Sequence, residues 1–370
     1  MEVPLSRPSI TEKEVQAVLE VLSTPYLSLG PRLKEFEARF AEYLGSRHAV
    51  AVSSGTAGLH AAVRALGIGQ GDEVITTPFS FVASANCLLF EGARPVFVDI
   101  DADTLNIDPR KIEERITPAT KALLIVHIFG RPCPMEEVMA IAGRQELPVI
   151  EDACEALGAR AGGKALGTIG KVGVFGFYPN KQLTTGEGGM VVTDDPELAA
   201  LLMSLRNQGR EERGWLAHYR LGYNYRLDEL SCALGLAQLS RLEEILAKRQ
   251  AAARRYNLSL AECRALGLPS PGEEEGVSWF VYVVRLPEGV EKETIKSELA
   301  QRGIATGDYF PPIHLQPLYR ERFGYEPGAF PVTEAVAATT LALPFFTDIG
   351  ENQQDYICEN LLSILREYGY

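Results

Sequence analysis

The amino-acid sequence predicts an α/β fold, with a mostly parallel, mixed seven-stranded sheet and a smaller C-terminal α+β domain. Two observations predict it. Between about residues 49 and 193, short β-rich apolar runs alternate with amphipathic stretches of helical period, a pattern typical of a sheet covered by helices on both faces. After a long helical pattern at 230–258, a further strand-like run and a helical stretch follow at 279–302, which indicate a second, smaller unit.

The expected strands of the sheet are short and apolar. They are Ala49–Val52, Glu73–Thr76, Pro95–Val98, Ala122–His127, Val149–Glu151, Val172–Phe177 and Met190–Thr193. Helical patterns such as Thr56–Leu66 and Met135–Ala142 lie between several of them. The last two strands are joined by a loop without a helix, so we expect them to pair antiparallel.

The C-terminal part begins with a long helical pattern, Leu230–Leu258, that links the two units. A segment rich in Pro, Gly and Glu, Gly267–Gly276, reads as a surface connection. A strand is expected at Trp279–Leu286, a helix at Lys292–Arg302 and a proline-rich loop at Tyr309–Pro317. We therefore expect a large domain over residues 1–245 and a small one over residues 246–370.

Composition narrows the function classes. The chain has a formal net charge of -13, whereas nucleic-acid binders are generally basic, so no nucleic-acid partner is expected. The sequence has no basic-then-apolar leader and no apolar run long enough to cross a bilayer, so no membrane partner is expected. Six scattered cysteines without a C-x-x-C pair predict free thiols in a cytoplasmic protein and no metal site.

Two segments combine small or acidic residues with the ends of expected strands. Ser53–Gly58 opens a helix, and free N–H groups at a helix N-terminus suit a phosphate; an ordinary capped turn explains the same residues. Glu151 and Asp152 end an apolar strand, at the edge where open α/β sheets bind ligands. A carboxylate there could hold a proton on a ligand nitrogen, or it could cap the following loop.

A single lysine, Lys181, lies in the Gly- and Thr-rich loop Phe177–Gly189 between two apolar strands. A lysine whose pKa is lowered by burial or by a neighbouring cation attacks carbonyl groups; the alternative is a solvated loop lysine. The segment Gly158–Lys164 has the spacing of a phosphate-binding P-loop, but Ala165 stands where a Ser or Thr would bind magnesium.

Taken in order, these segments resemble the DegT/DnrJ/EryC1/StrS family of sugar aminotransferases, which belong to fold-type I of the enzymes that use pyridoxal 5'-phosphate (PLP). The resemblance covers nearly the whole chain. Its motifs are weak singly and specific in this order: Leu5–Pro8, Leu27–Pro31, Ser54–Ala57, Glu151–Ala153, Tyr178–Lys181 with Thr185–Gly189, Gly222–Arg226 and His314–Pro317.

The resemblance implies two catalytic residues, Lys181 as the Schiff-base lysine and Asp152 as the partner of the cofactor's pyridinium nitrogen. It implies further cofactor contacts from the backbone of Gly55 and Thr56, which match the phosphate cup. Phe81 falls where an aromatic ring stacks on the cofactor, although a core phenylalanine at a helix start is the alternative.

The resemblance also implies a partner subunit and a substrate pocket. Asn224 matches a residue that reaches the phosphate of the neighbouring subunit, which implies a homodimer with shared active sites. Ser28, Tyr309 and His314 fall at substrate-binding positions, and His314 could equally be structural.

Two residues depart from the family pattern. Glu155 stands near the ring hydroxyl where the family usually has Gln or His, so its carboxyl would have to be protonated or paired elsewhere. Gly176 stands where the family commonly has a Ser that binds the phosphate.

The activity implied is transfer of an amino group from an amino acid, L-glutamate by the family pattern, to a nucleotide-linked keto-sugar, in amino-sugar and polysaccharide biosynthesis. Three alternatives stay open. A dehydratase of the same family carries His in place of the lysine, so Lys181 argues against it. A ketocyclitol or another non-nucleotide ketone could be the acceptor. A non-catalytic regulatory protein could share the fold, although Lys181 with Asp152 argues against it.

Overall fold

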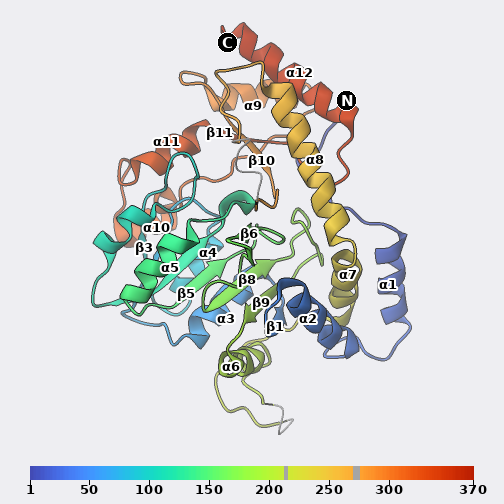
Figure 1. Ribbon diagram of the computed structural model, residues 1–370, viewed down its shortest axis with the longest axis vertical. Helices are drawn as coiled ribbons and strands as arrows, with labels where there is room; N and C mark the ends of the chain where they lie inside the picture. Colours follow the sequence, from blue (N-terminus) through green and yellow to red (C-terminus); the bar gives the residue numbers. More distant parts are fainter. Residues whose placement is uncertain (212–215, 270–275) are drawn as a thin grey trace.

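The computed structural model describes residues 1–211, 216–269 and 276–370. Its main sheet has seven strands in the order β1-β9-β8-β5-β4-β2-β3 (Figure 1). The strands are β1 (His48–Val52), β2 (Glu73–Thr76), β3 (Arg94–Phe97), β4 (Thr120–Val126), β5 (Val149–Asp152), β8 (Val172–Gly176) and β9 (Gly189–Thr193). All seven predicted strands are confirmed.

The directions of the strands bring the carboxyl ends of most of them to one edge of the sheet. β9 pairs antiparallel with both β8 and β1, as predicted for its pairing with β8, and the other neighbouring pairs are parallel. The carboxyl ends of β2, β3, β4, β5 and β8 therefore lie along the same edge. The loop from β8 to β9, which carries Lys181, starts at that edge.

Helices cover both faces of the sheet because successive strand residues point to opposite sides. In β1, Ala49 and Ala51 join the core beneath α2 (Pro31–Leu44) and α5 (Met135–Arg144). Val50 and Val52 join the opposite core. The helices of that second face are α3 (Gly55–Ala65), α4 (Ala83–Leu89) and α6 (Pro196–Arg206).

The prediction of a helical stretch over Leu230–Leu258 is confirmed, but its continuity is wrong. The structure has two helices, α7 (Glu229–Leu239) and α8 (Leu242–Leu260). Arg241 between them leaves helical geometry, with φ -116° and ψ 6°. Its guanidinium donates to Glu14 of α1 (Glu12–Leu22) at 2.7 Å. The apolar spacing continues across the break, so the sequence pattern does not reveal it.

The C-terminal part has a core of its own, built on the antiparallel pair β10 (Tyr282–Arg285) and β11 (Thr340–Leu343). The predicted strand at Trp279–Leu286 is thus present in shorter form, and the predicted helix at Lys292–Arg302 is confirmed. The helices are α9 (Lys292–Gln301), α10 (Pro317–Phe323), α11 (Pro331–Thr339) and α12 (Glu351–Glu367). Of the predicted connection Gly267–Gly276, residues 270–275 lie outside the described part.

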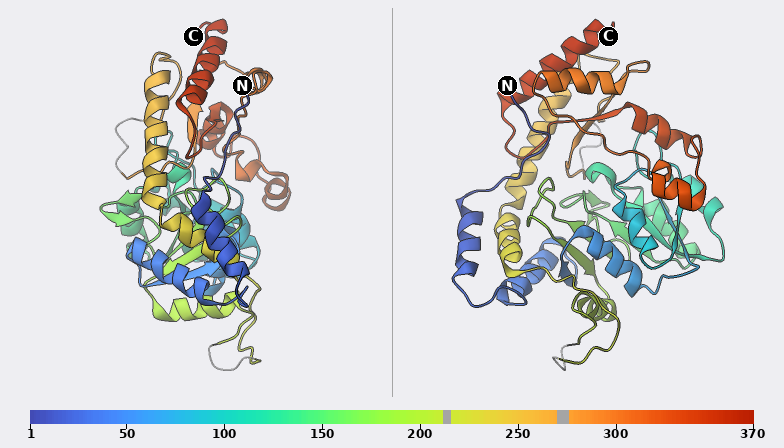
Figure 2. Two further views of the ribbon diagram at one scale, coloured as in Figure 1. Left: turned by 90° about the vertical axis from the view of Figure 1, so that its right-hand side faces the viewer. Right: turned by 180° about the vertical axis from the view of Figure 1, so that it is seen from behind.

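The N-terminal residues pack with this C-terminal part. Val3 pairs with Ile304 and belongs to the same core, and both chain ends lie at the end of the molecule that carries α12 (Figure 2). The division at residue 245 stays a prediction. Among the helices described, none has the length and apolar character needed to cross a membrane.

The P-loop-like segment forms a small hairpin, β6 (Arg160–Ala161) and β7 (Lys164–Ala165). Gly162 and Gly163 make its turn with φ of 55° and 80°, a region that glycine enters without strain. The glycine spacing therefore belongs to a turn.

Candidate active site

A cavity of about 1090 Å³ opens at the carboxyl edge of the main sheet. The ends of β5 and β8 and the starts of α3 and α4 form one side, and the loop 308–319 of the C-terminal part forms the other. Seven of the predicted site residues line it: Gly55, Thr56, Phe81, Asp152, Glu155, Lys181 and Tyr309.

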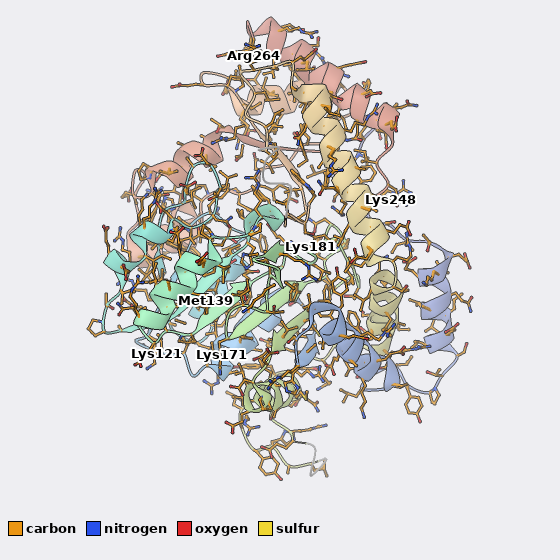
Figure 3. All side chains as sticks on the ribbon, viewed as in Figure 1. Lys121, Met139, Lys171, Lys181, Lys248 and Arg264 are labelled. Atoms are coloured by element: carbon orange, nitrogen blue, oxygen red, sulfur yellow. The ribbon has the colours of Figure 1, made fainter. Side chains whose placement is uncertain are left out.

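Lys181 lies deep in this cavity, between the sheet and α8 (Figure 3). Its side chain is 15% exposed, which rules out a solvated loop lysine. The backbone N–H of Lys181 donates to the carbonyl of Tyr178 at 2.9 Å, closing a tight turn. The amine Nζ lies 3.5 Å from Oε1 of Glu155 and 3.8 Å from the ring centroid of Phe280. The amine therefore rests between a carboxylate and an aromatic face.

The two acids at the end of β5 point to opposite sides. Glu151 is fully buried away from the cavity, where it accepts hydrogen bonds from His127 Nε2 at 3.0 Å and from backbone N–H groups including that of Gly167. Asp152 lines the cavity, and its Oδ2 accepts from the hydroxyl of Ser84 at 2.7 Å. Of the two carboxylates, Asp152 is the one that can meet a ligand.

Both oxygens of Glu155 have partners. Oε2 accepts from the backbone N–H of Phe129 at 2.9 Å, and Oε1 faces Lys181. Burial raises the pKa of Glu155, against the opposing effects of Lys181 and the Phe129 N–H. A glutamate where the family usually has Gln or His is thus accommodated in two ways. Its carboxyl contacts Lys181 and the Phe129 N–H, and its surroundings favour its protonated form.

The first turn of α3 presents backbone to the cavity. Ser54 is the N-cap, and its hydroxyl accepts from the N–H of Ala57 at 3.0 Å. A Cβ on Gly55 would come within 2.9 Å of Cys154 Sγ and 3.2 Å of the Gly176 Cα. Only glycine at residue 55 allows this approach, which brings the backbone at a helix N-terminus to the surface of the cavity.

Aromatic rings form the mouth and wall. Phe81 is 58% exposed and lies 6.3 Å from the ring of Phe310, so it is not a core phenylalanine. The hydroxyl of Tyr309 accepts from the side-chain amide of Asn180 at 3.3 Å. This bond links the loop 308–319 to the lysine loop, Phe177–Gly189, which carries Lys181.

Three predicted site residues lie outside the cavity. His314 is fully buried, with Nε2 3.0 Å from Glu334, and is packed on Phe330. Ser28 makes a backbone bridge to Asp228. Asn224 is exposed and bridges to Asn207. Among the residues that the structure describes, the chain's own cavity does not include these three.

Sequence reasoning missed Ser84, Phe280 and Phe129. Ser84 lies four residues after Ser80, whose hydroxyl is 2.8 Å away, and a pair of serines flanking Phe81 is a signal that could have indicated it. Phe280 and Phe129 reach the site through tertiary packing, for which the sequence holds no local signal.

Comparison with known proteins agrees with this geometry. The DegT/DnrJ/EryC1/StrS aminotransferase family matches residues 8–362. The chain is 38% identical to the spore coat polysaccharide biosynthesis protein SpsC of Bacillus subtilis (strain 168), over 98% of this chain and 97% of SpsC.

Solved structures match over the same length. PseC of Helicobacter pylori, an aminotransferase involved in the biosynthesis of pseudoaminic acid, is 30% identical with a TM-score of 0.95, covering 99% of this chain and 100% of PseC. The PLP form of Spr1654 of Streptococcus pneumoniae, a putative sugar aminotransferase, is 27% identical with a TM-score of 0.94, covering 99% of each chain.

The match along the chain and the lysine-bearing cavity at the carboxyl edge of a mixed sheet lead to one conclusion. This chain belongs to the DegT/DnrJ/EryC1/StrS aminotransferase family and is a PLP-dependent aminotransferase of the kind that serves sugar and polysaccharide biosynthesis.

Proposed function

We propose that this protein transfers the amino group of L-glutamate to a nucleotide-linked keto-sugar, as a homodimer whose two active sites are shared between subunits. The observation that carries the proposal is the enclosed amine of Lys181, held beside Glu155 in the same cavity as Asp152.

The residues of the cavity fit the cofactor of the family. Gly55 and Gly176 expose backbone at the N-terminus of α3, where backbone N–H groups favour a phosphate. The carboxylate of Asp152 suits a protonated ring nitrogen, and the amine of Lys181 suits an aldehyde carbon. The exposed ring of Phe81 offers a face on which a flat heterocycle can stack.

When bound, PLP would supply an electron-withdrawing ring and an aldehyde carbon able to carry an amino group. The negative charge of Asp152 would favour a protonated ring nitrogen, and Ser84 orients that carboxylate. The amine of Lys181 would remove the proton from the donor's α-carbon as a base and deliver it as an acid. In the second half of the cycle Lys181 would move the proton in the opposite direction.

A second acceptor class has one observation in its favour. Among the described residues that line the cavity, Lys181 is the only lysine or arginine. The diphosphate of a nucleotide-linked sugar favours cationic partners, and in this proposal a second subunit supplies them. A ketocyclitol or another non-nucleotide ketone has no such requirement.

The decisive experiment offers purified enzyme L-glutamate together with a panel of nucleotide-linked keto-sugars and free ketocyclitols. Release of 2-oxoglutarate and the mass of the aminated product are measured, with Lys181→Ala as the inactive control. We expect turnover with a nucleotide-linked keto-sugar. Turnover with free ketones alone would contradict the proposed acceptor, and turnover with another amino acid alone would contradict the proposed donor.

A further inference from the structure

Arg249, on α8, is a buried cation that the steps above do not use. Its residue is 2% exposed, and a guanidinium has five N–H donors. Five neutral oxygens accept from it: Thr347 Oγ1 at 3.2 Å and the carbonyls of Trp279 at 3.3 Å, Phe280 at 3.1 Å, Asn180 at 3.3 Å and Lys181 at 3.4 Å.

Four of these five acceptors are backbone groups from two loops that meet at the site. Nη2 binds the carbonyls of Asn180 and Lys181, and Nη1 binds those of Trp279 and Phe280. The side chains of Lys181 and Phe280 in turn contact each other, with the amine 3.8 Å from the ring centroid. One planar guanidinium therefore sets the spacing between the reactive lysine and the ring on which its amine rests.

Such a group is costly for the fold. Removing a charge from water without an ionic partner is unfavourable, and burial lowers the pKa of Arg249 to about 10, with the charge of Asp348 acting in the opposite sense. An apolar side chain of the same volume would avoid this cost. An apolar side chain would not supply the planar set of N–H donors with which the guanidinium binds both loops at once.

We propose that Arg249 is a positioning residue. Its guanidinium binds the backbone carbonyls of Lys181 and Phe280 at the same time, which fixes the position of the Lys181 amine for proton transfer. This inference rests on the proposed function of Lys181. It assigns a role in catalysis to a residue that contacts neither the cofactor nor the substrate.

The test compares Arg249→Met and Arg249→Lys with a matched control, Tyr256→Phe. Tyr256 lies two turns further along α8 and is equally buried, and its hydroxyl donates to the carbonyl of Pro344 at 2.7 Å. The control thus removes a buried bond from the same helix to a main-chain carbonyl, away from the cavity. Three kinds of measurement are made: steady-state kinetics (kcat and KM for glutamate), the pH midpoint of the bound cofactor's absorbance change, and the rate at which acetic anhydride acetylates Lys181 in cofactor-free protein.

For Arg249→Met we expect kcat to fall about a hundredfold, since a displacement near 1 Å has an effect of this size, with KM for glutamate little changed. The absorbance midpoint and the acetylation rate of Lys181 should both shift. Arg249→Lys should recover part of kcat, because it restores the charge and some donors. Tyr256→Phe should lower thermal stability and leave the other three measurements at wild-type values.

The proposal is overturned if Arg249→Met keeps wild-type kcat, absorbance midpoint and acetylation rate. If Arg249→Met does not fold, Arg249→Lys decides on the same measurements. Failure of the proposed function looks different: borohydride reduction of the wild-type holoenzyme would then leave no pyridoxyl label on Lys181, whatever the Arg249 variants do.

Discussion

The amine of Lys181 and the carboxyl of Glu155 lie 3.5 Å apart at the bottom of a cavity that water reaches only partly. Lys181 comes from the loop after β8 and Glu155 from the turn after β5, so adjacent parallel strands bring the two together. This pair places the amine and a carboxyl group within hydrogen-bonding distance of each other in the same cavity.

Lys181 is predicted to be the only lysine that bonds covalently to the cofactor. Borohydride reduction followed by peptide mapping should place the pyridoxyl label on Lys181. Lys181→Ala should lose at least about a hundredfold in turnover, the usual effect of removing a general acid–base group. Lys164 and Lys171 are the internal controls: Lys164 is exposed and Lys171 pairs with Asp195 at the surface. A label on either would contradict the assignment.

Asp152→Asn should fold and lose about a hundredfold or more in turnover, because a neutral amide does not stabilise a protonated ring nitrogen. The hydroxyl of Ser84 can turn to accept from the new amide, so stability should change little. Ser84→Ala is the matched variant. It leaves the carboxylate in place, and we expect it to keep most of the activity. Near-normal turnover in Asp152→Asn would remove Asp152 from the mechanism.

Glu155 should make the stability of the cofactor-free protein depend on pH. Burial raises the pKa of Glu155 in the folded state, so the folded state holds this proton more tightly than the unfolded chain does. The contribution is complete below the unfolded pKa, about 4.3, and is lost as pH rises through the folded pKa.

The corresponding measurement is thermal unfolding of wild type and Glu155→Gln between pH 4 and pH 8. The melting temperature of wild type should fall relative to that of Glu155→Gln as the pH rises across this range. A constant difference between the two proteins would show that Glu155 does not titrate with folding.

Gly176 should limit cofactor affinity. A Cβ at this position would lie 3.3 Å from Cys154 Sγ and 3.4 Å from Cys154 Cβ, so serine is crowded there. We expect Gly176→Ser alone to gain little, whereas Gly176→Ser with Cys154→Ala has room for the hydroxyl. One added hydrogen bond to the phosphate should lower the Kd for PLP by about two- to tenfold. Cys154→Ala alone is the control, and equal Kd values in all three variants would contradict the prediction.

The proposed sharing of active sites between subunits predicts complementation between two inactive variants. Asn224 is exposed and lies outside its own chain's cavity. Asn224→Asp should abolish activity by placing a negative charge beside the neighbour's phosphate. After subunit exchange with Lys181→Ala, hybrid dimers contain one site with both residues intact, so activity should partly return. No recovery after verified exchange, or a fully active monomer, would contradict the shared site.

The sequence was a good guide to features that depend on short-range patterns. Apolar runs of three to six residues identified the strands of the main sheet, because strands buried on both faces are predominantly apolar. The Gly- and Thr-rich composition around Lys181 singled out the loop that carries the reactive amine. The strand pattern alone did not distinguish Glu151 from Asp152, since the direction of each side chain depends on register within the sheet; only the family resemblance singled out Asp152.

Features that depend on tertiary contacts were beyond sequence reasoning. The break at Arg241 follows from its contact with Glu14, more than 200 residues away in the chain. The local sequence around His314 does not reveal whether its side chain faces a substrate or, as the structure shows, a glutamate. Phe280 enters the site only because the C-terminal part folds back over the sheet, which no local pattern encodes.

The antiparallel return of β9 has a consequence for how this site can be altered. Gly176 and Gly189 are paired directly across β8 and β9, and the N–H of Phe177 donates to the carbonyl of Gly188 at 2.9 Å. Both ends of the lysine loop are therefore fastened at the same point of the sheet, whereas a parallel connection would carry the chain to the opposite edge. A change in the length of this loop would therefore leave the pairing of β8 with β9 in place, whereas a change at Gln182 would also break its hydrogen bonds to Glu155 and Ser278.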